Sequence, residues 1–174
     1  IQGPSFQHRN PINADTSENI VLKKGTPRVK RNLKGSVFSL LTGGGGNSNY
    51  WHWLFDVLPR LKILEQKINL SDIDFFLLPD LNEKFQLETL DLLNIPDKKR
   101  VSSKIFRHIQ TDYAYAVDHP YVLENNASDG ILNLPMWILD FLRDKFLVKE
   151  NEKKFPQKFY IDRSDSKSNH RHLR

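Results

Sequence analysis

The chain of 174 residues contains no cysteine. This absence excludes disulfide bonds, thiolate zinc sites and cysteine nucleophiles, and it fits a reducing compartment. No apolar run approaches the roughly 20 residues that a membrane-spanning helix requires, and no signal peptide is recognised at the start of the sequence. Because the chain opens on Ile1 and stops in "NHRHLR", we expect it to be a piece of a longer protein. The lack of a membrane-spanning run and of a signal peptide therefore applies to this piece and not to the longer protein.

The two standard nucleotide-binding motifs are also missing, although glycines fill positions 43–46. A Walker loop would need a lysine after its last glycine, and a Rossmann fingerprint would need a third glycine where Ser48 stands. What remains is a glycine turn, including Gly44 and Gly45, followed by Asn49 as a capping residue that leads into a helix. The free amides at such a helix start favour an anion, so an anion-binding loop and a plain turn both stay open.

Candidate metal ligands occur only in pairs. Asp72 and Asp74 look like a DxD motif, but they open an apolar strand and are expected to be turn residues. Asp118 and His119 form a lone acid–imidazole pair. Neither pair reaches three convergent ligands, so the residues themselves predict no metal site and no cofactor.

What the sequence does contain is an excess of basic residues, with a net charge of +5 and a pI near 9.4. The excess is concentrated in Lys23–Gly35 and in Arg163–Arg174. Runs of this kind are most often a solvated face, and the alternative is binding of an anion such as a phosphate, a nucleic acid or an acidic lipid. The aromatic residues lie in apolar segments rather than among the lysines, which does not favour a nucleic-acid-binding module.

Strand-like and helix-like segments alternate along the chain. Short apolar runs predict strands, and apolar positions with a period of about 3.6 residues predict helices. The expected strands cover 35–41, 72–79, 113–120 and 158–163, and the expected helices cover 49–68, 82–96 and 134–148. Pro59 either kinks the first helix or opens a second one. The alternation predicts an α/β fold with a largely parallel sheet and flanking helices, in which ligands lie beyond the carboxyl ends of the strands.

His52, Asp56 and Arg60 follow the glycines at four-residue intervals. This spacing places all three on one face of a continuous helix. A carboxylate so close to Trp53 and Phe55 is either exposed on the opposite face or partly removed from water. A poised His52 or Asp56 could take a proton from a hydroxyl. The alternative is an ion pair on a helix surface, worth about 0.2–0.5 kcal/mol.

Arginines gather after the last expected strand. Arg163 stands at the end of that strand, and Arg171 follows within a short loop. Guanidinium groups bind phosphate oxygens two at a time, which suits a diphosphate. The alternative is a basic chain end with no ligand.

Several of these segments, taken in order, resemble glycosyltransferase family 61, which is associated with capsular polysaccharide biosynthesis. The segments are "NYWHWLFDVLPRLKIL", "DFFLLP", "LDLLNIP", "NLPMWILDFLRDKF" and "KFYIDRSDSKSNHRHL". The resemblance runs from about Gly35 to Arg174. Its most specific parts are the HxxxD helix with the LPR that follows, and the Y-I-x-R strand with its trailing arginine.

Members of this family are inverting glycosyltransferases of the GT-B type, in which two Rossmann-like domains face each other across a cleft. The resemblance implies that His52 and Asp56 line the acceptor side of the cleft and that one of them is the catalytic base. It implies that Arg163 and Arg171 bind the diphosphate of a nucleotide-sugar donor. It leaves open whether a divalent metal assists.

The function that the resemblance implies is transfer of a sugar to a hydroxyl of a glycan, or of a lipid-linked glycan, in surface polysaccharide synthesis. Gly44, Gly45 and Asn49 would form a loop at the mouth of the cleft. The expected location is cytoplasmic, with peripheral contact at a membrane left open.

The resemblance also predicts how the chain is divided. Residues 1–34 would be an irregular basic leader, 35–157 a Rossmann-like acceptor-side domain, and 158–174 the start of a truncated nucleotide-sugar-binding domain. The family's Asn-Glu pair would lie past Arg174, so we expect the piece alone to be inactive. The alternatives are a non-catalytic α/β scaffold and a basic nucleic-acid-binding module.

Overall fold

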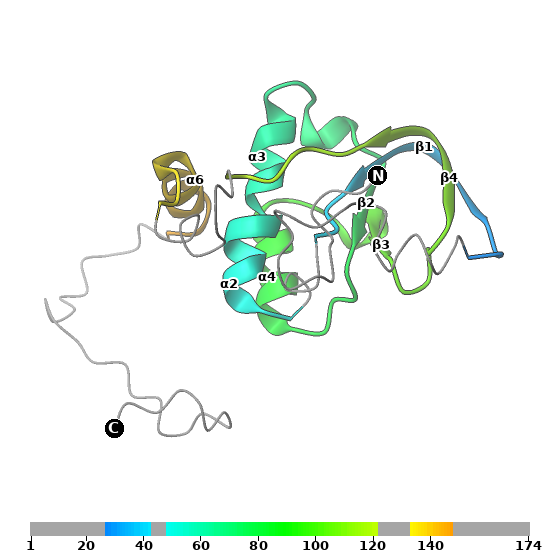
Figure 1. The fold of residues 1–174 in the computed structure, drawn as a ribbon, viewed down its shortest axis with the longest axis horizontal. Coiled ribbons are helices and arrows are strands. Elements are labelled where there is room, and N and C mark those ends of the chain that lie inside the picture. Colours follow the sequence, from blue (N-terminus) through cyan, green and yellow to red (C-terminus); the bar gives the residue numbers. More distant parts are fainter. Residues whose placement is uncertain (1–26, 43–47, 122–132, 148–174) are drawn as a thin grey trace, which may run out of the picture.

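A four-stranded parallel sheet organises the chain in the computed structural model, which describes residues 27–42, 48–121 and 133–147 (Figure 1). The strand order is β3-β2-β1-β4, and every neighbouring pair runs parallel. The strands are β1 (Arg31–Ser39), β2 (Phe75–Leu78), β3 (Arg100–Ser102) and β4 (Ile109–Tyr115). The predicted α/β class with a parallel sheet is therefore confirmed.

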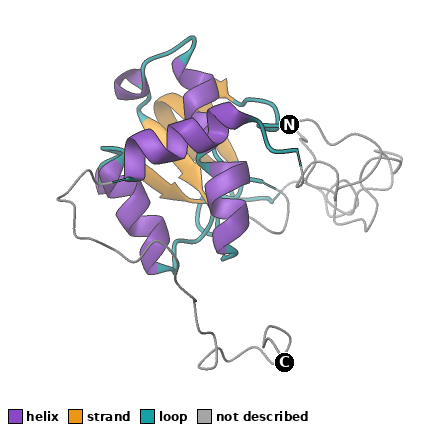
Figure 2. Ribbon diagram, turned by 90° about the vertical axis from the view of Figure 1, so that its left-hand side faces the viewer, coloured by secondary structure: helices purple, strands orange, loops and turns teal. Residues whose placement is uncertain are grey.

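Helices lie in the connections from β1 to β2 and from β2 to β3, as is usual for a crossover between parallel strands, whereas residues 103–108 join β3 to β4 without a helix. The first crossover contains α2 (Tyr50–His52), a π-helical turn (Trp53–Val57) and α3 (Pro59–Glu65), and the second contains α4 (Lys84–Leu92). Single 3₁₀ turns at Leu70–Asp72 and Asp97–Lys99 precede β2 and β3, and α6 (Met136–Phe146) packs on α3 and α4. Figures 1 and 2 show α3, α4 and α6 on the same side of the sheet.

The core lies between these helices and one face of the sheet. Phe38 and Phe76 are aligned in neighbouring strands, and their rings meet edge to face with centroids 6.4 Å apart. Trp53 is fully buried, and its indole N–H donates to the Thr89 hydroxyl of α4 at 2.9 Å. Fully burying an aliphatic or phenyl side chain contributes about 1.5–3 kcal/mol. The apolar side chains that share this cluster include Leu40, Leu58, Leu61, Leu78 and Leu90.

A bulge in β1 explains why a glycine stands at position 35. The register against β4 shifts between Leu33 and Ser36, and Gly35 has a φ of 106°. A Cβ added at Gly35 would lie 2.3 Å from Oδ2 of Asp74, so no other residue fits without displacing that carboxylate. The Gly35 amide donates to Asp112 at 2.7 Å, and the Ser36 amide donates to Asp74 at 2.8 Å. Two carboxylates thus satisfy the amides that the bulge releases from the sheet.

The observed strands differ from the sequence prediction at most of their boundaries: β2 is shorter than the expected 72–79, and β4 begins earlier than the expected 113. β1 begins at Arg31, inside the segment expected to be irregular, because the start of β4 pairs with it from Ile109 onward. β4 ends at Tyr115 and not at 120. β3 was not predicted, because three residues show no hydrophobic period. Asp72 and Asp74 lie in and after the 3₁₀ turn before β2, as expected of turn residues.

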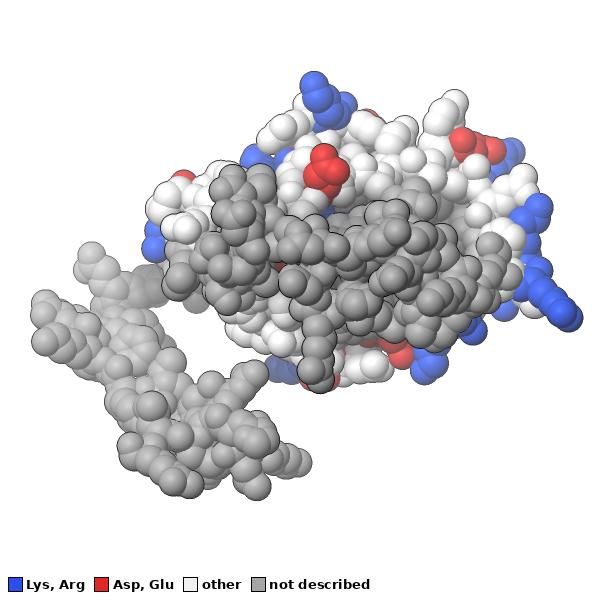
Figure 3. Space-filling view, viewed as in Figure 1, with Lys and Arg blue, Asp and Glu red and all other residues white. Residues whose placement is uncertain are grey.

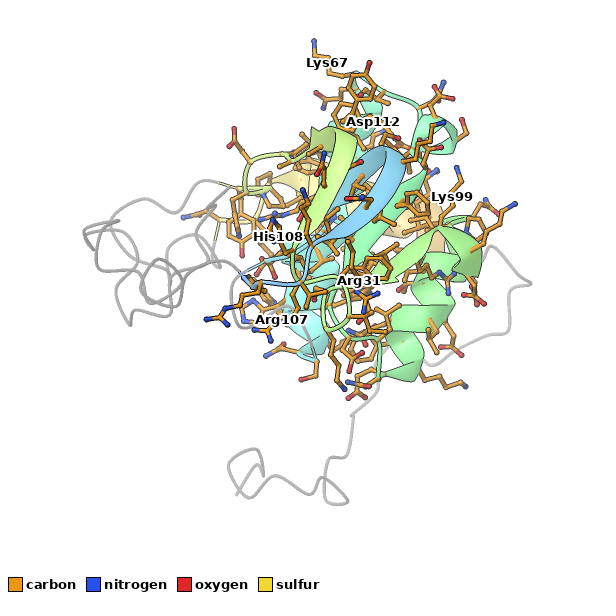
Figure 4. The ribbon with its side chains drawn as sticks, turned by 90° about the vertical axis from the view of Figure 1, so that its right-hand side faces the viewer. Arg31, Lys67, Lys99, Arg107, His108 and Asp112 are labelled. Carbon is orange, nitrogen blue, oxygen red and sulfur yellow. The ribbon has the colours of Figure 1, made fainter. Side chains whose placement is uncertain are left out.

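The connection from β3 to β4 is held by the first residue of β1. The guanidinium of Arg31 donates to the carbonyl of Ile105 at 3.1 Å and lies 5.4 Å from the ring centroid of Phe106. The Arg31 amide donates to the carbonyl of His108 at 2.9 Å, so the two residues lie together where β1 and β4 begin (Figure 4). These contacts accompany the pairing of β4 with β1.

The described part of the first basic run lies in solvent. Arg28, Lys30 and Lys34 are exposed, and Figure 3 shows Lys and Arg side chains along the right-hand end of the molecule. This exposure fits a solvated basic face. No helix within the described ranges has the length and apolar character needed to cross a membrane.

Candidate functional site

The candidate site lies beyond the carboxyl ends of β1 and β4. The chain leaves β1 through Leu40 and Leu41, and α2 begins at Tyr50. Asn49 caps this helix, because its side-chain oxygen accepts from the amide of Trp51 at 3.0 Å and from that of His52 at 3.4 Å. The capping role is confirmed, whereas Gly44 and Gly45 of the expected cleft loop lie outside the described residues. These contacts fix the start of the helix that carries His52.

The helix changes its pitch directly after His52. The Leu58 amide donates to the carbonyl of Trp53 at 3.0 Å, the five-residue spacing of a π-helix. Pro59 provides a cause, since its ring would clash with the carbonyl four residues earlier and it has no amide to donate. α3 then begins with Pro59 in its first turn, so the expected alternative in which the proline opens a second helix is the one observed. Single π turns of this kind often occur at functional sites.

His52 and Asp56 form a directly bonded pair in this segment. Nδ1 of His52 lies 2.6 Å from Oδ2 of Asp56. The His52 side chain is 36% exposed, whereas the Asp56 side chain is only 11% exposed. A solvated ion pair on a helix surface therefore does not describe the arrangement, and the carboxylate is the partly desolvated one that the sequence left as an option. With Nδ1 turned to the carboxylate, Nε2 is the ring nitrogen left for a ligand.

Two residues from the segment after β4 complete the surroundings of Asp56. The Tyr121 hydroxyl donates to Oδ1 of Asp56 at 2.6 Å, and Nε2 of His119 lies 3.7 Å from the same oxygen. Burial lowers the pKa of His119 and raises that of the Tyr121 hydroxyl, which is further raised by its bond to Asp56. The tyrosine thus stays a hydroxyl donor and the imidazole is neutral at neutral pH.

The sequence pointed to His119 only as half of a weak metal-like pair, and it did not point to Tyr121. The available signal was the presence of polar aromatic side chains in and after the predicted strand "YAYAVDHP". That signal does not indicate which residue each side chain contacts. The pairing of β1 with β4 brings this segment to Asp56.

Arg60 joins the same helix to the end of β1. It is buried, and its Nε donates to the backbone carbonyl of Asp56 at 3.0 Å while a terminal nitrogen donates to the carbonyl of Leu41 at 3.3 Å. Burial lowers the pKa of this guanidinium, and the negative charges of Asp56 and Asp118 oppose that shift. His52, Asp56 and Arg60 are therefore brought together. Arg60, however, donates to backbone carbonyls and not to the Asp56 carboxylate.

Half-buried aromatic rings flank the pair on the adjacent face of the helix. The ring of Trp51 meets the imidazole of His52 edge-on, with centroids 5.2 Å apart, and lies 4.9 Å from the ring of Phe55. The site thus offers an apolar surface beside a partly exposed imidazole. Arg163 and Arg171, the expected diphosphate ligands, lie outside the described residues.

The arrangement suits proton transfer better than metal binding. Across the described ranges no group of three or more His, Asp or Glu side chains is placed to hold a metal ion. An imidazole whose Nδ1–H is held by a carboxylate presents its second nitrogen as a proton acceptor, which is the chemistry of a general base.

The chain was compared with protein-family models, curated proteins and solved structures. No protein-family model matches the chain, and no curated protein or solved structure matches it significantly.

Proposed function

We propose that this chain forms the acceptor-side part of an inverting glycosyltransferase and that His52 is its catalytic base. The observation that carries the proposal is the 2.6 Å contact between Nδ1 of His52 and the buried Asp56 carboxylate, with the imidazole half-exposed. Both oxygens of Asp56 already have protein partners, so the histidine is the member of the pair that is free to meet a substrate. Asp56 then orients the imidazole and stabilises its protonated form.

In the proposed reaction an acceptor hydroxyl oxygen attacks the anomeric carbon of a nucleotide sugar. The bond between that carbon and the diphosphate oxygen breaks, and the nucleoside diphosphate leaves with the electron pair. The hydroxyl proton moves to Nε2 of His52, and the configuration at the anomeric carbon inverts. A positioned base of this kind contributes roughly 10²–10⁴ in rate.

The position of the pair in the sheet supports a ligand site. The chain adds β2 and β3 on one side of β1 and then returns to add β4 on the other side. In α/β sheets ligands bind beyond the carboxyl ends of the strands, at the place where the strand order reverses in this way. His52 follows β1 and His119 follows β4, so the proposed site lies at that place.

The sequence resemblance supports the choice of glycosyl transfer among the reactions that use a base. It assigns the described residues to the acceptor-side, Rossmann-like half of a GT-B enzyme, and Arg163 and Arg171 to a donor diphosphate. Trp51 adds a half-buried ring beside His52, and the apolar face of a sugar ring packs well on such a surface.

The test uses the complete gene product and begins with binding of the donor. UDP, GDP, CDP and their sugars are screened for a shift in the unfolding midpoint, since a ligand at a hundred times its Kd adds about 2.7 kcal/mol of stability. We expect a selective shift with one nucleotide, followed by nucleoside diphosphate release when simple glycosides are supplied as acceptors. No shift from a folded protein would favour the non-catalytic scaffold. Salt-dependent binding of nucleic acid instead would favour the nucleic-acid module.

A further inference from the structure

The carboxylate of Asp56 is held from two directions by residues that are far apart in the sequence. Oδ2 contacts Nδ1 of His52 at 2.6 Å, and Oδ1 accepts from the Tyr121 hydroxyl, also at 2.6 Å. Asp56 is 8% exposed and Tyr121 is 7% exposed, so water does not compete freely for either oxygen. Because an ionised carboxylate only accepts, the single hydroxyl hydrogen of Tyr121 is committed to Oδ1.

Tyr121 is itself held by His119. Nδ1 of His119 lies 2.9 Å from the backbone carbonyl of Tyr121, and the two rings meet edge to face with centroids 4.4 Å apart. A carbonyl accepts only, so Nδ1 carries the hydrogen in this contact. Burial lowers the pKa of His119 and thereby favours the neutral ring, whose one hydrogen is then the one on Nδ1. The histidine therefore fixes both the backbone and the ring of Tyr121.

Rotation of a carboxylate about its last bond is otherwise weakly restricted. The terminal torsion of aspartate has a broad, two-fold preference, so one contact through one oxygen does not define the plane of the group. A second contact, through the other oxygen, does define it. The orientation of Asp56 in turn decides which ring nitrogen of His52 carries the hydrogen.

We propose that Tyr121, held by His119, is a positioning residue that fixes the plane of the Asp56 carboxylate and so keeps His52 in the tautomer with its hydrogen on Nδ1. The free lone pair of His52 is then on Nε2, the nitrogen that the proposed reaction uses. The effect on turnover rests on the proposed function, whereas the effect on the tautomer does not.

The tautomer is measured by NMR on the complete gene product with 15N-labelled histidine, at a pH where His52 is neutral. In the parent we expect His52 to give one protonated nitrogen, Nδ1, and one unprotonated nitrogen, Nε2. In Y121F we expect the two nitrogen shifts to move toward each other, because both tautomers become populated. Y113F is the matched control, since Tyr113 belongs to the preceding strand and is 64% exposed. Unchanged His52 shifts in a folded Y121F protein would overturn the proposal.

The phenylalanine keeps the ring, so Y121F is expected to fold. H119Q gives a second test, because loss of the imidazole loosens Tyr121 and should move the His52 shifts in the same direction. If a folded H119Q protein keeps the parent His52 shifts, His119 does not hold Tyr121, and that part of the proposal is overturned.

Turnover gives a separate readout. In Y121F we expect kcat to fall about 10- to 100-fold with KM nearly unchanged, the range for one hydrogen bond to a charged group. Altered His52 shifts in a protein without transferase activity would leave the positioning role standing and remove the proposed function. Parent-like His52 shifts and a parent-like kcat in an active Y121F enzyme would remove the positioning role of Tyr121 and leave the proposed function standing.

Discussion

At the scale of single residues, the Asp56 carboxylate joins two distant parts of the chain. Its contact with His52 lies within one turn of helix, whereas its contact with Tyr121 spans 65 positions. The local contact follows from the i, i+4 spacing, and the distant one depends on β4 lying beside β1. The folded sheet thus adds a second contact to the carboxylate, which separates this pair from an ion pair on an isolated helix.

Removal of either member of the pair tests the base directly. If His52 is the base that we propose, H52A and D56N in the complete gene product should lower kcat by at least about 10², because a general base contributes roughly 10²–10⁴ in rate. The amide NMR spectrum of each variant should keep the dispersion of a folded protein. Y113F serves again as the control and should keep parent turnover. Full activity in both H52A and D56N would remove the pair from the mechanism.

The sequence anticipated this site in part. Spacing placed His52 and Asp56 together, and the structure brings them into contact. For His119 the sequence indicates only a pairing with Asp118, and for Tyr121 it indicates no role. Neither could be assigned from the sequence, because only the pairing of β4 with β1 shows which segment reaches Asp56. Local periodicity contains no information about that pairing.

At the scale of elements, the break at Pro59 was predictable and its form was not. The proline must interrupt the helix, but the sequence allowed a kink or two separate helices. The structure joins them through a π-helical turn at Trp53–Val57. Burial of Trp53 and the backbone contacts of Arg60 hold this turn against the rest of the fold. Helix propensities describe local sequence only, so they could not predict tertiary contacts of this kind.

The bulge in β1 provides a test of stability at the same scale. G35A adds a Cβ 2.3 Å from Oδ2 of Asp74 at a φ of 106°. We expect the free energy of unfolding to fall by about 1–3 kcal/mol, the usual cost of such a backbone conformation, and by more if Asp74 must move. Urea unfolding measures the difference. The control is K34A at the exposed neighbouring residue, whose free energy of unfolding should stay within about 0.5 kcal/mol of the parent value. A loss in G35A no greater than in K34A would show that the strand accommodates a side chain there.

At the scale of the whole molecule, the alternation of strands and helices predicted the α/β fold class correctly. It did not predict the order of the strands in the sheet. β1, β2 and β3 follow one another across the sheet, as helical crossovers of this length usually dictate. β4 instead pairs with the far side of β1, from Arg31 opposite Ile109 to Phe38 opposite Tyr115. This pairing brings His119 and Tyr121 to the site.

The half-buried imidazole of His119 links the stability of the whole fold to pH. Its pKa in the folded protein is lowered by burial, whereas in the unfolded chain it is about 6.5. Between the two values the unfolded state binds more protons, so the free energy of unfolding rises with pH in this window. The contribution is fully present above the unfolded pKa and is lost as the pH falls through the folded one. The charged and titratable groups facing this ring are Asp56, Arg60, His52 and Tyr121.

Comparison with H119Q isolates this contribution, because the other titrating groups are shared by both proteins. We expect H119Q to lower the free energy of unfolding at pH 7.5 and to lower it by less at pH 5.5. At the lower pH the parent must protonate a half-buried imidazole, and the variant has none to protonate. The difference should narrow by at most about 1.4 kcal/mol per pH unit. Urea unfolding at a series of pH values measures both proteins. A difference that stays constant from pH 7.5 to 5.5 would show that His119 takes up its proton equally well in the folded and unfolded chains, and the ring would then not be the neutral donor that holds Tyr121.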